Sequence, residues 1–514
     1  MKNKLRTPSA LTRLADAGSR ADIIYRHPYL VTAAACFGSV LLFDYSAGTL
    51  TPWALILIGL AFAFLIGLGI YWAKKGELTP RRVAFLIVAA SFLVKLAYVL
   101  STGLSDRQHD VGTFKESSIG HAGRIFRTYE GELFPETIRG QAYHPPLHYV
   151  IEAAWLKILS WRGFAIGAAK HYVTAVTLFY SCALTVVCRK ITREFGFNEN
   201  VQNLCLALVA FHPTFIILAA SYNNDLLSIL LLFVAMLYAI RWFREPTFKN
   251  ILFLALGIGL GMMSKLSAGY IAPAVAVLFI IKLITLKGNR VKLLGEYCAF
   301  GAVCVPLGTW WSFYMLAVHD KPLGYVMKLS SKLPQYIGFR TASERLFGFF
   351  ESLSESIWFA RGTDTGFSDA FYEYNIPSAV LKTSVFGEWQ IGKGNGFTEF
   401  LAYALIMLNA VIILFSLWCT VRMITKKHPG VKGALKCFLY ILWATVIVTY
   451  VKFCFDYPHN CTMDFRYIVP TAVLGVIFIG AYTDLAKNKA LKAAVYSVCG
   501  AFCLVGALLY TIAV

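Results

Sequence analysis

The chain has 514 residues, of which 58% are hydrophobic and 15% are charged, and its mean hydropathy is +0.61. Water-soluble globular proteins are nearer to half apolar, so this composition excludes a single soluble core. The 48 Lys and Arg outnumber the 28 Asp and Glu, which gives a formal net charge of +20. Because no Lys/Arg-rich surface domain is present, the excess indicates cytoplasmic loops between membrane spans and excludes a nucleic-acid partner.

In chain order, about 13 apolar runs have a length that suits a membrane-spanning helix. They cover residues 29–45, 53–73, 83–101, 172–188, 204–221, 226–240, 251–263, 268–284, 294–317, 400–421, 435–453, 467–481 and 493–514. We therefore predict an all-α polytopic membrane protein. Most of the 12 cysteines fall inside these runs, and we interpret them as small lipid-phase hydrophobes.

The basic residues fall on alternate loops between the runs, as the positive-inside rule requires when no span is missed. With the basic N-terminal residues on the inner side, the inner loops carry Lys74/Lys75/Arg81/Arg82, Arg189/Lys190/Arg193, Arg241/Arg244, Lys282/Lys287/Arg290/Lys292, Arg422/Lys426/Lys427 and Lys487/Lys489. The alternation holds only if the apolar stretch 147–161, which contains Glu152 and Lys157, does not cross the membrane. We predict that this stretch forms a helix in the membrane interface.

This topology divides the chain into five parts. They are the N-terminus with the first three spans (1–101), a first outer loop with the interfacial helix (102–171), a central group of spans (172–317), a second outer loop (318–399) and the C-terminal spans (400–514). Because both long loops lie on the outer face and nearly every inner loop is short, we expect the chemistry on the outer face.

Candidate functional residues cluster in the first outer loop. Asp106, His109 and Asp110 follow the third span directly, and partial dehydration near the bilayer can raise the pKa of a carboxylic acid toward that of a useful base. The alternative is a solvated loop in which an Asp caps a short helix. Further on, two prolines separate His144 from His148 and predict a helix start between them. These histidines could bind a lipid phosphate or a metal, but the spacing alone favours a plain helix start.

Later turns add polar residues at the same face. Lys265 lies in a short turn between two spans and could neutralise a phosphate, although a lysine that snorkels to the interface is the alternative. Asn223, Asn224 and Asp225 precede a span and exceed what one helix cap requires. Arg466 lies next to the membrane, where it either forms a structural ion pair or receives an anionic ligand.

The order of these motifs resembles the GT-C superfamily of polytopic membrane glycosyltransferases. It is most similar to the branch of protein O-mannosyltransferases and lipid A aminoarabinose transferases. The motifs that carry the resemblance are RQHD (107–110), YHPPLHY (143–149), SYNND (221–225), MMSKLSAG (262–269) and KTSVFGEW (382–389). Two features depart from the family pattern, since the acidic loop follows the third span rather than the first, and His109-Asp110 replaces an adjacent Asp-Glu pair.

The resemblance implies an enzyme that transfers a sugar, with inversion, from a polyprenyl-phosphate donor to an acceptor on the periplasmic or luminal face. Asp110 would then be the general base, with Asp106 as the second candidate. Donor and phosphate binding would fall to a set of polar residues around the same loops. These residues are Tyr143, His144, His148, Asn224, Asp225, Lys265 and Arg466. The metal requirement, any cofactor, the sugar and the acceptor are left open.

The alternative function is a polytopic transporter or lipid flippase. Transporters place charged residues at the bilayer midplane and show two related halves, whereas here the polar clusters lie mainly at the outer ends of spans. Asp44 and Lys95 are the charged residues within apolar runs that favour this alternative. Residues 1–27 lack the pattern of a cleaved signal, which favours a bacterial cytoplasmic membrane over an endoplasmic reticulum membrane.

Overall fold

The computed structural model describes residues 26–43, 52–103, 106, 108–348, 356–358, 373–389 and 395–512. The basic N-terminal residues up to position 25 and Asp44 lie outside the described residues. Within the described part the chain is helical, with two isolated β-bridges and no strand. The predicted all-α class is therefore confirmed.

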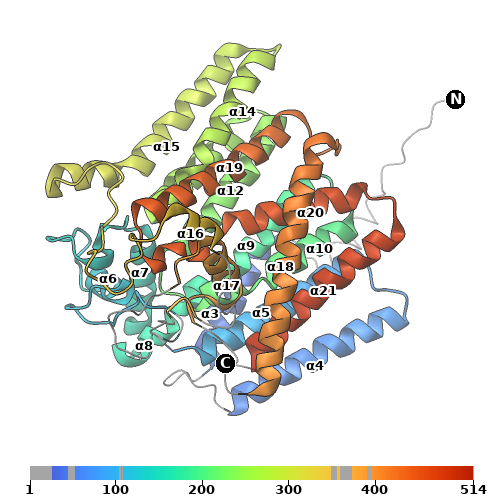
Figure 1. The fold of residues 1–514 in the computed structure, drawn as a ribbon, viewed down its shortest axis with the longest axis horizontal. Helices are drawn as coiled ribbons and strands as arrows, with labels where there is room; N and C mark the ends of the chain where they lie inside the picture. Colours follow the sequence, from blue (N-terminus) through green and yellow to red (C-terminus); the bar gives the residue numbers. More distant parts are fainter. Residues whose placement is uncertain are drawn as a thin grey trace.

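The helices follow one another with few long connections (Figure 1). The first half contains α3 (Pro28–Leu42), α4 (Pro52–Lys74), α5 (Pro80–Ser101), α6 (His121–Tyr129), η1 (Gly140–Tyr143), α7 (Leu147–Trp161), α8 (Ile166–Tyr172), α9 (Thr174–Glu194), α10 (Glu199–Ala210), α11 (Pro213–Ile217), η2 (Leu218–Ala220) and α12 (Asp225–Arg244). The second half contains α13 (Phe248–Ser264), η3 (Leu266–Ile271), α14 (Ala272–Thr285), α15 (Arg290–His319), α16 (Ala342–Phe347), α17 (Ile376–Phe386), α18 (Gly396–Thr425), α19 (Gly433–Asp456), η5 (Asn460–Met463), η6 (Phe465–Tyr467), α20 (Pro470–Leu485) and α21 (Lys489–Ile512).

Each of the predicted apolar runs corresponds to helix, but the count of about 13 spans is not confirmed. Nine helices in the described part are long and apolar enough to cross a membrane, or up to ten when a bent pair is counted as one span. Three further runs form the shorter apolar helices α3, α13 and α20. The bent pair comprises Glu199–Ala210 and Pro213–Ala220, which meet at 55°. Pro213 causes the break, since proline cannot continue the hydrogen-bond ladder of the preceding helix.

The helix α7 spans Leu147–Trp161, the stretch that we expected to form an interfacial helix. Pro146 is its N-cap, so the prolines open the helix as predicted, and His148 lies in its first turn. Glu152 is buried, whereas Lys157, Ile158 and Trp161 are exposed on the other side.

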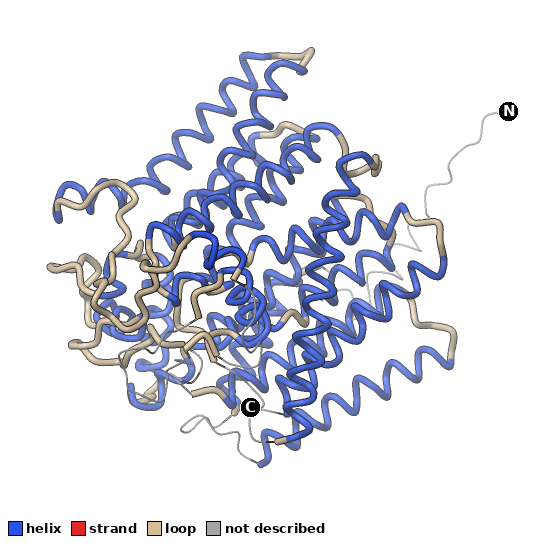
Figure 2. The backbone as a smooth tube through the Cα atoms, in the orientation of Figure 1, coloured by secondary structure: helices blue, strands red, loops and turns tan. Residues whose placement is uncertain are grey.

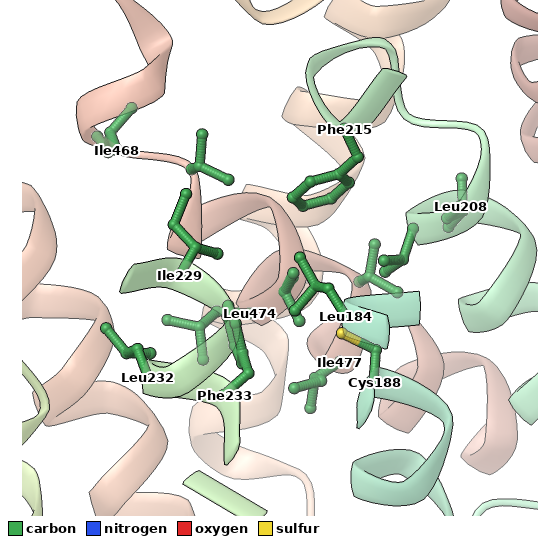
Figure 3. Packing of buried hydrophobic residues seen from close by; sticks show 14 of the residues in the cluster. Leu184, Cys188, Leu208, Phe215, Ile229, Leu232, Phe233, Ile468, Leu474 and Ile477 are labelled. Carbon is green, nitrogen blue, oxygen red and sulfur yellow. The ribbon is translucent and has the colours of Figure 1, made fainter. Parts of the chain in front are cut away.

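The core lies between the long helices. Buried apolar side chains from α9, α10, α11, α12 and α20 meet there, as Figure 3 shows for Leu184, Phe215, Phe233 and Leu474. Of the 12 cysteines, 10 are buried and none forms a disulfide. The core also contains Lys95, whose Nζ donates to Thr185 Oγ1 at 3.3 Å and to the Ser181 carbonyl at 3.5 Å.

The long loops gather at one end of the helix bundle, around α6, α7, α8 and α16 (Figures 1 and 2). Direct contacts join the first long segment to the last turns of α15, from which the second long segment continues. The indole of Trp311 at the end of α15 donates to the Tyr143 carbonyl at 2.9 Å, and Phe134 packs on Tyr314 with ring centroids 5.2 Å apart. The end of the bundle where the long loops gather around α6, α7, α8 and α16 is therefore the most complex part of the surface, and we refer to it as the elaborated end.

We predict that Phe233→Ala destabilises the fold strongly, because Phe233 is fully buried in the central cluster. Loss of a buried phenyl ring costs about 3–5 kcal/mol through lost burial and a residual cavity. Thermal unfolding of the detergent-solubilised protein should show a clear drop in the midpoint. The matched control is Phe400→Ala, since Phe400 in α18 is 65% exposed. Equal midpoints for the two variants would contradict this view of the core.

Candidate active site

A cavity of about 380 Å³ lies at the elaborated end of the bundle. Its polar lining comes from the first long loop, from the starts and ends of spans in the middle of the chain, and from the turn between α19 and α20. These residues are His109, Asp110, His121, Gln141, Tyr143, His144, Asp225, Lys265, Tyr457, His459, Arg466 and Tyr467. The lining also includes Tyr325, Val326 and Met327 from the second long segment, and Ser267, Tyr270, Tyr450 and Thr462 add further polar groups.

The loop that carries Asp110 closes on itself. The Asp110 carbonyl accepts the backbone N–H of His121 at 3.0 Å, and the Val111 carbonyl accepts that of Ala122 at 2.8 Å. Gly112 turns the chain with a φ of +67°, a conformation that favours glycine. Because α6 begins at His121, the turn places the side chains of Asp110 and His121 next to each other.

Asp110 forms a buried ion pair with Arg466. Its Oδ2 lies 2.9 Å from Arg466 Nη2 and 3.4 Å from His121 Nε2. Burial by itself would raise the pKa of Asp110, but the charges of Arg466 and His121 outweigh it and hold the pKa well below its usual range. Our expectation that dehydration raises this pKa is therefore wrong for the structure as it stands, because the sequence did not reveal the cation beside the carboxylate.

A second cation, Lys265, lies in the same cavity. It follows α13 directly, and its Nζ pairs with Asp225, the first residue of α12. Its Nζ also lies 4.7 Å from the ring centroid of Tyr467, and the guanidinium carbon of Arg466 lies 5.1 Å from the same ring. Tyr467 therefore contacts both cations, which places them at one site although they are far apart in the sequence.

Asp464 and Tyr467 hold Arg466 in place, but part of its guanidinium group has no hydrogen-bond acceptor within the described part of the chain. Its backbone N–H donates to Asp464 Oδ1 at 2.9 Å, and its Nε lies 3.8 Å from Asp464 Oδ2. Its Nη2 also donates to the Tyr467 hydroxyl at 3.2 Å. Its Nη1 is buried and has no hydrogen-bond partner among the described residues. A buried arginine with an unused donor, facing a cavity, suits an incoming anion.

Glu388, which we did not predict as a site residue, connects the second long loop to the first. Its Oε2 accepts the backbone N–H of His109 at 3.0 Å and lies 2.7 Å from His109 Nδ1, while its Oε1 lies 3.7 Å from Arg466 Nη2. Burial lowers the pKa of His109, but the Glu388 carboxylate more than compensates and raises it to about 10. The imidazole is then positively charged at neutral pH. The KTSVFGEW motif contains Glu388 and was the available signal.

The structure separates the two histidines that flank the prolines. His144 and Tyr143 line the cavity, and the His144 ring stacks on His121 with centroids 5.8 Å apart. Burial and the nearby Lys265 lower the pKa of His144 well below its usual value, so it is neutral. His148 is fully buried outside the cavity lining, with Nε2 at 3.1 Å from the Tyr222 carbonyl and 3.5 Å from Glu152 Oε1.

Two other predicted site residues also lie outside the cavity lining. Asp106 is exposed, and its Oδ2 accepts the backbone N–H of Gly103 at 2.5 Å, so it stabilises a turn. Asn224 donates from Nδ2 to the Ser264 carbonyl at 2.6 Å and thereby connects α12 to the end of α13. The N-cap residue of α12 is Asn224, but its side chain makes no capping bond, and it is Asn223 Oδ1 that accepts the Asp225 N–H at 3.1 Å. No group of three or more His, Cys, Asp or Glu side chains suited to a metal ion occurs in the described part of the chain.

Comparison with known proteins gives one family match and several structural likenesses. The crystal structure of ArnT from Cupriavidus metallidurans bound to undecaprenyl phosphate matches at 13% identity and a TM-score of 0.45, and the match covers 84% of this chain and 76% of that chain. The apo structure of the same protein matches at 14% identity and a TM-score of 0.47, and the match covers 86% of this chain and 76% of that chain. The apo oligosaccharyltransferase of Archaeoglobus fulgidus matches at 14% identity and a TM-score of 0.44, covering 85% of this chain and 56% of that chain. Likenesses of this extent carry no functional argument. No curated protein sequence matches the chain.

The family match concerns the centre of the chain. Residues 143–310 match the family model described as dolichyl-phosphate-mannose-protein mannosyltransferase. This segment contains YHPPLHY, SYNND and MMSKLSAG, and it supplies Tyr143, His144, Asp225 and Lys265 to the cavity. On an all-helical fold with many apolar spans, the match confirms the resemblance to polytopic membrane glycosyltransferases of the GT-C superfamily.

Proposed function

We propose that this membrane glycosyltransferase takes its sugar from a polyprenyl-phosphate donor and transfers it, with inversion, to an acceptor at the elaborated end of the bundle, on the outer face of the membrane. The observation that carries the proposal is the Asp110–Arg466 ion pair in a cavity that also contains Lys265. The matched family is named for a donor of this chemical class, dolichyl-phosphate mannose.

The two cations form the proposed phosphate site. Lys265 and Arg466 both line the cavity and both contact the Tyr467 ring, and Arg466 Nη1 has an unused donor. A phosphate bound between them would receive a charge-assisted hydrogen bond from each. As the sugar leaves, the negative charge on the phosphate grows, so these contacts strengthen in the transition state and lower its energy.

The carboxylate of Asp110 is the proposed general base. It takes the proton from the acceptor, the acceptor atom forms a bond to the anomeric carbon, and the bond from that carbon to the phosphate oxygen breaks with its electron pair. The products are the glycosylated acceptor, polyprenyl phosphate and a protonated Asp110. Attack from the side opposite the departing phosphate, as in an in-line displacement, inverts the anomeric centre.

Arg466 connects the proposed phosphate site to the proposed general base, because it contacts Asp110 and would also contact the donor phosphate. In the resting site its charge lowers the pKa of Asp110 and makes the carboxylate a weak base. A donor phosphate at Arg466 would neutralise part of that charge, so the pKa of Asp110 would rise while the carboxyl group stays buried. The base would therefore gain strength only when the donor is bound.

Neutral and aromatic groups would shape the remainder of the site. His144 and Tyr143 lie on the wall beside Asp110, next to Tyr325 and Met327. A neutral imidazole at His144 can donate to or accept from a sugar hydroxyl without adding charge. His109, which pairs with Glu388, adds a positively charged imidazole to the cavity wall.

The first test is sugar release from a synthetic polyprenyl-phosphate monosaccharide by the purified protein. We expect Asp110→Asn to reduce turnover by about 100-fold or more, as is typical for loss of a general base. Binding of the donor should persist, because Lys265 and Arg466 are retained. Donor affinity is measured separately, for example by titration of the lipid in detergent.

Asp106→Asn is the matched comparison, since Asp106 lies in the same loop but is exposed and turned toward Gly103. It should keep most of the turnover. If Asp106→Asn abolishes turnover and Asp110→Asn does not, the assignment of the base is wrong. If neither protein binds the donor and both move lipid or solute across vesicles, the transporter alternative replaces the glycosyltransferase proposal.

A second test uses the pH dependence of kcat/KM, which reports groups of the free enzyme. The carboxylate of Asp110 must be ionised, and Arg466, His121 and His109 hold its pKa low. Activity of the wild type should therefore persist down to about pH 4, the usual pKa of an Asp. The variant His121→Gln keeps a hydrogen-bond donor but removes the imidazole that lowers the pKa of Asp110, so this pKa rises and activity is lost at higher pH.

The control for this shift is His319→Gln, the same substitution at the end of α15, where His319 Nε2 lies 3.3 Å from the Tyr314 hydroxyl. Its profile should coincide with that of the wild type. If the fall of kcat/KM at low pH occurs at the same pH in His121→Gln as in the wild type, Asp110 is not the titrating group.

A further inference from the structure

A second cavity, of about 350 Å³, lies between α3, α5 and α9 and is separate from the candidate active site. Most of its wall is apolar. The apolar lining includes Val31 and Ala35 of α3, Val88, Ala89 and Phe92 of α5 and Val186 of α9. None of the lining residues belongs to the set that lines the active-site cavity. We refer to this cavity as the α3–α5–α9 groove.

The groove follows one face of α9. Its residues on that helix recur at spacings of three and four, beginning at Cys182 in the middle of the helix and ending at Arg193 in the last turn. At a rise of 1.5 Å per residue this face is about 16 Å long. The hydrocarbon core of a bilayer is about 30 Å thick, so the groove has the depth of one leaflet.

Positive charge gathers at one end of the groove. Arg189, Lys190 and Arg193 are all lining residues, and the wall contains no Asp or Glu within the described residues. The nearest acid along the chain, Glu194, is already paired with Arg241 at 2.7 Å and with Arg244 at 3.4 Å. The ammonium group of Lys190 lies 4.1 Å from the ring centroid of Tyr29, at the start of α3. Arg189 already donates from Nη1 to Asn203 Oδ1 at 3.2 Å, whereas Lys190 and Arg193 form no ion pair with an acid of the groove in the described part of the chain.

We propose that the α3–α5–α9 groove is a binding site for an anionic phospholipid of the leaflet at the basic end. An acyl chain would occupy the apolar part beside Val88 and Phe92, and the phosphate would lie between Lys190 and Arg193. Basic pockets between spans on the cytoplasmic side have the right chemistry for anionic lipid headgroups. The positive-inside pattern puts this end on the cytoplasmic side, opposite to the proposed reaction.

The depth of the groove favours a phospholipid over a polyprenyl phosphate. The groove ends near Cys182 and Thr185, at the middle of α9, where Thr185 Oγ1 is engaged by Lys95. An acyl chain spans one leaflet, whereas a long polyprenyl chain would have to leave the groove. The site is therefore independent of the donor site and of the identity of the transferred sugar.

The test is native mass spectrometry of the full-length protein, exchanged from detergent into known amounts of phosphatidylglycerol, phosphatidylcholine or undecaprenyl phosphate. We expect the wild type to retain one phosphatidylglycerol in preference to phosphatidylcholine. The double variant Lys190→Gln, Arg193→Gln should bind phosphatidylglycerol about 30-fold more weakly, which corresponds to about 1 kcal/mol for each cation. A second variant, Ala89→Phe, fills the apolar part without changing charge and should also lose the lipid.

The charge-matched control is Lys287→Gln, Arg290→Gln, which removes two cations from the predicted inner loop between α14 and α15, outside the groove lining. It should retain phosphatidylglycerol like the wild type. Equal retention of phosphatidylcholine, an equal loss in the control, or displacement of phosphatidylglycerol by undecaprenyl phosphate at equal concentration would overturn the proposal. Sugar release is measured on the same samples, so a failure of the lipid site is distinguishable from a failure of the proposed enzyme.

Discussion

The buried ion pair between Asp110 and Arg466 is the interaction on which the candidate site depends. Removing two charges from water is expensive, and such a pair persists only where further groups satisfy the remaining donors and acceptors. Here His121 lies beside the carboxylate, and Asp464 and the Tyr467 hydroxyl contact the guanidinium, whereas Asp110 Oδ1 and Arg466 Nη1 have no hydrogen-bond partner among the described residues and can still receive a ligand. The loops at this end of the bundle are therefore constrained by one electrostatic arrangement, and it explains why they fold back over the spans.

The charges of the site alternate in sign. Lys265 pairs with Asp225 and Arg466 pairs with Asp110, while the ring of Tyr467 contacts both cations. Two like charges near each other would be unfavourable without these acids. The same balance makes the site close to neutral. A donor phosphodiester, which carries one negative charge, therefore meets cations that are already in position and has to compete only with their present partners.

Much of the fold could be predicted from the sequence, because lipid-facing helices need long apolar runs whatever their neighbours are. Apolar helices that are short for a membrane span, such as α13 with 17 residues, arise where helices pack inside the bundle and need not match the bilayer alone. The cavity brings together Asp110, Lys265 and Arg466, as their places at the ends of spans suggested. Polarity alone could not distinguish Asp106 and His148, which lie outside the lining, from the residues that face the cavity.

The contribution of Glu388 and the direction of the pKa shift of Asp110 could not be predicted, because both depend on neighbours far away in the sequence. Glu388 meets His109 across a separation of 279 residues. No local pattern of apolar and polar residues records such a contact. The low pKa of Asp110 likewise follows from a guanidinium contributed by a turn near the C-terminus. Hydropathy places a residue at the membrane surface but does not identify what it faces.

The wide separation of Asp110 and Arg466 has a consequence for biosynthesis. The ribosome releases Asp110 long before Arg466, and at about 5–20 residues per second the interval is roughly 20 to 70 s. During that time the carboxylate of the first loop has no guanidinium partner and stays in water, where its charge is solvated. The loop can dock onto the spans only after the turn between α19 and α20 has been inserted. Assembly of this end of the molecule is thus a late step, which the C-terminal spans complete.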